Sequence, residues 1–271
     1  MINIVTSGCS FTHDPDSWAN VLQKKLSDKY TVTNVADGGQ GQEYIVRFAI
    51  TQLEKTVGAK ICIVQISGFS RALLYIDKLE NPVLYEQIRN EGKYRDETFV
   101  GLNKVTRNIV GIKTTDIDHT WWKTFKLKNL RKVINGYNLA IATDQRIILS
   151  YENISRLQMY CKLNKIPLLC FYGWKQVEIE PNNPEFVNTI RSQVDWNNMW
   201  FHKNDGGMAE WMLDHGHHGK LEEDHINKPP TGIGKGPLTG NAFMVGHPTA
   251  EAHNDFCEQV IVPWVNSVSH E

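Results

Sequence analysis

Several short stretches of this sequence carry the residue types that acyl transfer requires. Ser10 follows an apolar stretch at 2–6, Gly39 lies in a glycine-rich loop, Ser67 follows a second apolar stretch, and His247 precedes the last helical pattern. Acyl transfer uses a hydroxyl nucleophile, N–H donors that face the developing oxyanion, and an imidazole base. If the fold gathers these residues, the sequence predicts a Ser-His centre.

The elements that must position these residues alternate between strand and helix. Apolar strands that alternate with amphipathic helices are typical of a parallel sheet with helices on both faces. Loops after the carboxyl ends of parallel strands meet at one edge, where ligands bind. We therefore expect the four residues to converge there. Strands are predicted at 2–6, 30–36, 61–66 and 166–172, and helices at 16–26, 42–55, 137–163 and from 248 onward.

Two long ranges interrupt this alternation. Residues 68–135 and 174–246 follow no clean period, and the second range is rich in Trp, Gly, His and Pro. Irregular segments of this length inside a compact domain are usually functional. We therefore expect a single α/β domain over residues 1–271 with two large insertions, at about 68–135 and 174–246, the second forming a lid.

The composition excludes several classes of partner. The chain has 41% apolar and 22% charged residues and a net charge of −1, so it lacks the basic excess of nucleic-acid-binding proteins. No apolar run is long enough to span a bilayer. We expect neither a nucleic-acid partner nor a membrane contact, and the sequence leaves the oligomeric state open.

The cysteines indicate a reducing environment. Their number, five, is odd, and they are scattered through apolar contexts. This pattern fits buried free thiols better than a disulfide framework or a CxxC metal site. No signal peptide is visible, because the chain begins directly with a strand. We therefore expect the protein to be located in the cytoplasm or in another reducing compartment.

The candidate stretches resemble, in order, the sequence blocks of the SGNH (GDSL-like) hydrolase superfamily. Residues 8–12, Gly-Cys-Ser-Phe-Thr, resemble the block that carries the nucleophile, and residues 34–41 resemble the block whose glycine donates an N–H to the oxyanion. His247-Pro248 resembles the block with the catalytic histidine. The resemblance implies a flavodoxin-like three-layer α/β/α fold with a mostly parallel sheet, and serine esterase or deacylase activity.

The resemblance also implies the roles of the site residues. Ser10 corresponds to the nucleophile and His247 to the base, while the N–H groups of Ser10 and Gly39 correspond to oxyanion donors. Ser67 stands where the family offers an asparagine as a further donor, and Cys9 stands where it usually has an aspartate. Serine-dependent ester hydrolysis needs no metal or other cofactor, and we expect none.

The catalytic acid is missing from its usual place. Three residues before His247, where the family has an aspartate, the chain has Met244. Asp224, at the end of an acidic run, is the tentative replacement, and a backbone carbonyl is another candidate. Because of these departures, the alternative of a non-catalytic binding or structural protein that retains the fold stays open.

The insertions would form the pocket walls and so set the substrate. A small-molecule or saccharide ester is expected, with an O-acetyl group on a saccharide as one candidate. The tryptophans of the second insertion could stack on a sugar or pack in the core, and both alternatives stay open. They are Trp196, Trp200 and Trp211.

Several candidate residues could have a structural role instead of a functional one. Ser10 could be a helix cap, and His253, inside the last helical pattern, is expected to be a packing residue. The histidine-rich run at 214–225 could ligate zinc. However, no two of its histidines have the i, i+4 spacing of a helical metal site, and glycines interrupt it. We interpret this run as part of the lid and expect no metal site.

Overall fold

The structure is a computed structural model that describes residues 2–38, 40–68, 71–75, 109–113, 143–176, 181–217 and 248–269. Its main sheet has five strands in the order β2-β1-β3-β6-β7, and each neighbouring pair is parallel. Renumbered along the chain, this order is 2-1-3-4-5, the flavodoxin-like arrangement. The predicted fold class is therefore confirmed. The strands are β1 (Ile2–Ser7), β2 (Tyr30–Asn34), β3 (Lys60–Ile66), β6 (Leu168–Tyr172) and β7 (Met199–Trp200).

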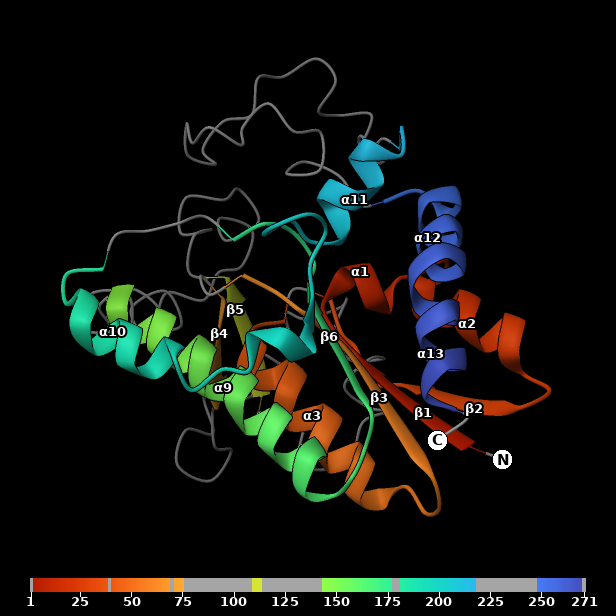
Figure 1. Cartoon of the computed structure of the whole chain (residues 1–271), viewed down its shortest axis with the longest axis horizontal. Coiled ribbons are helices and arrows are strands. Elements are labelled where there is room, and N and C mark those ends of the chain that lie inside the picture. The colour runs from red at the N-terminus through yellow and green to blue at the C-terminus, as the bar shows by residue number, and fades with distance from the viewer. Residues whose placement is uncertain are drawn as a thin grey trace, which may run out of the picture.

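Helices cover both faces of the main sheet (Figure 1). One layer contains α2 (Trp18–Leu26), α12 (Ala250–Phe256) and α13 (Val262–Val268), and the other contains α3 (Gln42–Lys55) and α9 (Thr143–Leu163). The expected three-layer α/β/α architecture is thus present, with the parallel strands sandwiched between the helical layers.

The core forms where the helical period meets the strands. α3 buries Ile45, Ala49 and Leu53, which recur every four residues and so lie on one helical face. In β3, consecutive residues such as Ile63 and Val64 are both buried, as expected for a central strand covered on both faces. Full burial of such an aliphatic side chain contributes roughly 1.5–3 kcal/mol.

The range 68–135 contains a separate two-stranded sheet. β4 (Arg71–Tyr75) pairs antiparallel with β5 (Ile109–Lys113). Residues 76–108 and 114–142 lie outside the described residues, so the expected insertion stays a prediction there.

The range 174–246 contributes regular elements as well. It contains α10 (Pro184–Arg191), the 3-10 turn η1 (Trp196–Asn198), β7 and α11 (Met208–Asp214). β7 is an edge strand of the main sheet, so this part of the range belongs to the core architecture. The remaining parts of the predicted lid, residues 177–180 and 218–246, lie outside the described residues.

The C-terminal helical segment is interrupted. Between α12 and α13 the chain makes a π-helical turn, η4 (Cys257–Ile261). Pro263 follows this turn, and proline has no N–H to donate to the carbonyl four residues earlier. The irregular turn therefore lies where a regular α-helix would lose a hydrogen bond.

All five cysteines are buried and unpaired, which confirms the expectation of buried free thiols. Burial raises the pKa of the Cys257 thiol to about 12, so this thiol stays protonated at neutral pH. Within the described part of the chain, no helix combines the length and apolarity needed to cross a membrane.

Candidate active site

Ser10 lies three positions after the last residue of β1 and is the first residue of the short helix α1 (Ser10–His13). The N-cap residue of α1 is Cys9. Ser10 is therefore not the N-cap residue, which was the structural alternative to a nucleophile role. The turn is tight at Gly8, where a Cβ atom would lie 2.2 Å from Thr12 Oγ1. Glycine at position 8 is therefore needed for this close approach.

The turn that carries Ser10 is hydrogen-bonded to the segment after β2. The Asp37 N–H donates to Gly8 O at 3.3 Å. The Asn34 side chain donates from Nδ2 to Thr12 O at 2.7 Å, and His13 Nδ1 lies 3.0 Å from Ala36 O. These contacts bring the first and second candidate stretches together, as the sequence predicts.

Gly39 itself lies outside the described residues, but both its neighbours are described. The Gly38 N–H donates to Asp37 Oδ1 at 2.7 Å, and Gln40 Nε2 donates to Asp37 Oδ2 at 2.7 Å. The Asp37 carboxylate therefore binds the loop on both sides of Gly39. Asp37 itself was not among the residues selected from the sequence.

Ser67 is buried at the end of β3 and contacts the same loop. Its Oγ donates to Gln40 O at 3.0 Å, and Gln42 Nε2 donates to Ser67 O at 2.7 Å. The single hydroxyl proton of Ser67 is thus already donated to a backbone carbonyl. In this arrangement Ser67 links the glycine loop to β3.

Gln65 lies beneath the Ser10 turn and is fully buried. Its Oε1 accepts hydrogen bonds from Cys9 N at 3.1 Å, Cys9 Sγ at 3.2 Å and Thr12 Oγ1 at 3.2 Å. Gln65 is not among the site residues predicted from the sequence. A sequence signal for a special role does exist, because Gln65 is a polar residue within an otherwise apolar strand segment.

His247, the predicted base, and Asp224, the tentative acid, lie outside the described residues. The chain is described again from Pro248, and α12 follows with Thr249 as its N-cap residue, whose side chain accepts from Ala252 N at 3.2 Å. His253 is buried in α12. This burial agrees with the packing role expected for His253.

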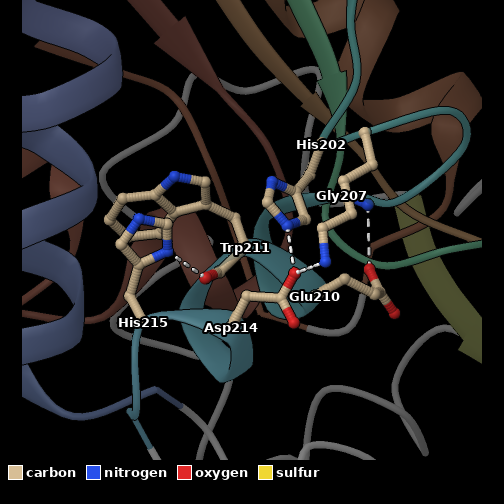
Figure 2. Close-up of polar contacts among 7 residues, drawn as sticks. His202, Gly207, Glu210, Trp211, Asp214 and His215 are labelled. Carbon is tan, nitrogen blue, oxygen red and sulfur yellow. Dashed lines mark hydrogen bonds and ion pairs between the residues drawn. The ribbon is translucent and has the colours of Figure 1, made fainter.

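A second polar cluster surrounds α11 (Figure 2). His202, just after β7, places Nε2 2.6 Å from Asp214 Oδ2, and Lys203 forms an ion pair with the same carboxylate. Hydrogen bonds from Lys203 and His202 lower the pKa of Asp214 to about 2. Asp214 is therefore ionised at neutral pH and holds the segment after β7 against the end of α11.

The start of α11 is held by Glu210 (Figure 2). Glu210 Oε2 accepts from Gly207 N at 2.8 Å and from Lys175 N at 2.8 Å. Because Lys175 follows β6 and Gly207 is the N-cap residue of α11, one carboxylate fixes two segments beyond the carboxyl ends of neighbouring strands. At Gly207 a Cβ atom would lie 2.4 Å from Tyr172 O, so the close approach requires glycine.

The described part of the histidine-rich run makes protein contacts. The His215 ring stacks on Trp211 with a centroid distance of 4.0 Å, and its Nδ1 lies 2.7 Å from Trp211 O. His217 Nε2 lies 3.1 Å from Asp255 Oδ2 on α12. Among residues that the structure describes, no group of three or more His, Cys, Asp or Glu could hold a metal ion. Residues 218–225 lie outside that set.

The tryptophans of the second insertion make aromatic contacts within the protein. The rings of Trp200 and Trp211 pack at 5.4 Å and 5.3 Å from the Phe256 ring. Trp196 packs edge-on against Tyr151 at 5.7 Å. Trp211 is buried. These contacts favour the packing alternative for Trp211.

Among known proteins, the chain is similar to several solved structures. No family model matches the chain, and no curated protein matches it. The chain is similar to the crystal structure of TesA, with 11% identity, a TM-score of 0.41 and 98% of each chain covered. It is also similar to a member of the lipolytic protein G-D-S-L family from Veillonella parvula DSM 2008, with 12% identity, a TM-score of 0.32 and 97% of each chain covered.

A third similar structure is that of an acetyl xylan esterase, AlAXEase. Its identity to this chain is 10% and the TM-score is 0.29, with 96% of this chain and 98% of that chain covered. The flavodoxin-like fold of the present protein is assigned from the order of its strands, β2-β1-β3-β6-β7, and not from these three similarities.

Proposed function

We propose that the protein is a hydrolase of the SGNH (GDSL-like) type that cleaves a carboxylic ester through Ser10 and His247. The observation that carries this proposal is the placement of Ser10. It opens a helix at the carboxyl end of β1, and its turn is hydrogen-bonded to the segment that leads to Gly39. The order of the sequence blocks supports the same assignment.

In the proposed reaction, Ser10 Oγ attacks the ester carbonyl carbon while its proton moves to His247. The backbone N–H groups of Ser10 and Gly39 donate to the oxyanion that forms. The bond between the acyl carbon and the alkoxy oxygen then breaks, and the alcohol leaves with the proton from His247. Water attacks the acyl-serine with His247 as base, which releases the carboxylic acid and restores Ser10.

The remaining site residues have supporting roles in this proposal. Asp224 is the proposed partner that orients His247, and a backbone carbonyl is the alternative. Met244 can neither fix the tautomer of the His247 ring nor stabilise its protonated form. Ser67, proposed from the sequence as an oxyanion donor, already donates to Gln40 O. We therefore assign Ser67 the task of holding the Gly39 loop, from which Gly39 donates.

The proposed substrate is a small-molecule or saccharide ester, with an O-acetyl saccharide or a short-chain ester as the class to test first. The second insertion, which supplies α11 and its polar contacts, would form a wall of the pocket. No metal or other cofactor takes part in the proposed steps.

The function is tested by covalent labelling. Incubation with a fluorophosphonate, followed by mass spectrometry, should place the adduct on Ser10. The Ser10→Ala variant should lose hydrolysis of p-nitrophenyl acetate by about 10⁴-fold, because removing the nucleophile removes the covalent route. Ser27→Ala, at the exposed end of α2, is the matched control and should keep full activity. An adduct elsewhere, or full activity in Ser10→Ala, contradicts the proposal.

A further inference from the structure

The Gln65 side chain lies between the turns that follow two neighbouring strands. β3 pairs with β1 on one side and with β6 on the other, and Gln65 is its second-to-last residue. The residue is fully buried. A buried amide needs hydrogen-bond partners for both its oxygen and its nitrogen, and the partners of Gln65 show what it holds in place.

The amide oxygen faces the turn after β1. Gln65 Oε1 accepts from the Cys9 N–H, the Cys9 S–H and the Thr12 O–H, at 3.1, 3.2 and 3.2 Å. Cys9 and Thr12 lie on either side of Ser10 in the sequence. The acceptor therefore fixes the backbone at both ends of the segment that presents Ser10. The Cys9 N–H is thereby donated within the protein interior.

The amide nitrogen faces the turn after β6. Gln65 Nε2 donates to Ile66 O at 2.8 Å, and the same carbonyl accepts from Gly173 N at 2.9 Å. A Cβ atom on Gly173 would lie 2.3 Å from Nε2, and one on Gly8 would lie 2.9 Å from Oε1. The two glycines thus leave a slot that the planar amide occupies. Three donors lie at its oxygen and one carbonyl lies at its nitrogen.

We propose that Gln65 is a positioning residue for the nucleophile, which acts through the backbone of residues 8–12 and does not touch the substrate. This inference rests on the proposed function of Ser10. The side chain must be neutral in this role, because it has to combine an acceptor toward Cys9 and Thr12 with a donor toward Ile66 O.

The first test removes the acceptor. Gln65→Leu should lower both the rate of Ser10 labelling by a fluorophosphonate and kcat for p-nitrophenyl acetate by about 100-fold, with KM nearly unchanged. A displacement of about 1 Å at the nucleophile has an effect of this size. The control is Asn153→Leu, which removes another buried amide, one that donates to Leu149 O within α9. Once folded, Asn153→Leu should keep wild-type labelling.

The second test keeps the shape and changes the protonation state. In Gln65→Glu an ionised carboxylate keeps the acceptor for Cys9 and Thr12 but turns a negative oxygen toward Ile66 O. A protonated carboxyl can donate there and so replaces the amide. The activity of Gln65→Glu relative to wild type should therefore rise at least about 10-fold as the pH falls from 8 to 5, because protonation restores the donor. A ratio that stays flat and far below one across this range overturns the proposal, whereas a ratio near one throughout supports it, because a buried carboxyl that stays protonated keeps the donor.

A readout independent of activity separates this inference from the proposed function. In Gln65→Leu, amide hydrogen exchange in residues 8–13 and alkylation of Cys9 should both accelerate at least about 10-fold, because their shared acceptor is lost. Unchanged exchange there overturns the role of Gln65, whatever the labelling shows. Absence of labelling at Ser10 in the wild-type protein overturns the proposed function instead, even where exchange accelerates as expected.

Discussion

At the scale of single residues, the two histidines near the C-terminus should differ in effect. His247 lies before α12, whereas His253 is buried within α12. If His247 is the base, as proposed, the His247→Ala variant should lose kcat for p-nitrophenyl acetate by about 10⁴-fold. His253→Ala should keep kcat within a few-fold and should lower the urea midpoint of unfolding, because it empties a buried position.

Activity and unfolding must both be measured on each of these variants. A His253→Ala protein that is fully folded but inactive, beside an active His247→Ala protein, would reverse the assignment of the base. An equal loss of activity in both variants would contradict a purely structural role for His253.

The position of Ser10 shortly after a strand could be predicted from the sequence, because the turn that carries it is a local feature of a few consecutive residues. The sequence did not identify Gln65, whose partners Cys9 and Thr12 are more than fifty residues away in the chain. The same limit applies to Ser67: its type indicated a donor, but only the fold shows that Gln40 O receives its proton. Hydrogen-bond partners across strands are set by sheet order, which residue types do not specify.

At the scale of elements, the contacts at the end of α11 should make stability depend on pH. The pKa of Asp214 falls from 3.8 to about 2 in the folded protein, through Lys203 and His202. Its stabilising effect is therefore fully present above pH 3.8 and is lost as the pH falls toward 2. Asp214→Asn should unfold at a lower temperature than wild type at pH 6, and the difference should shrink as the pH falls from 3.8 through about 2.

Thermal unfolding at a series of pH values measures this difference. The control is Asp28→Asn, an exposed aspartate after α2, which should show no comparable difference at pH 6. A constant difference between wild type and Asp214→Asn down to pH 2 would mean that the carboxylate charge is not what holds α11.

Element boundaries could be predicted where one periodic signal dominates. The helix expected at 42–55 has those bounds in α3, since its apolar residues recur at helical spacing from the first turn to the last. The two-residue strand β7 could not be predicted, because Met199 and Trp200 are too few to show alternation. The π-helical turn η4 could not be predicted for a different reason. Its residues continue the apolar pattern of the flanking helices, so the sequence shows no break there.

At the scale of the whole molecule, Phe256 joins the C-terminal helix to the sheet and to α11. Its ring packs 5.4 Å from Phe171 on β6, 5.4 Å from Trp200 on β7 and 5.3 Å from Trp211 on α11. Phe256→Ala should lower the free energy of unfolding by about 3–5 kcal/mol, because a large buried ring leaves a cavity between these elements. Equilibrium unfolding in urea measures the loss.

The matched control for this substitution is Phe186→Ala on α10, where the side chain is 53% exposed. Its free energy of unfolding should change by less than about 0.5 kcal/mol. Equal losses in the two variants would contradict the view that Phe256 is a central contact of the fold.

The shortness of β7 has a consequence for how copies of this protein behave together in solution. A sheet edge is a template on which another chain can add a strand, and long exposed edges promote aggregation. Here the edge consists of two residues, preceded by η1 and followed by the His202–Gly206 bridge. This border therefore offers an incoming strand little backbone to pair with, and the sheet is protected on that side against edge-to-edge association.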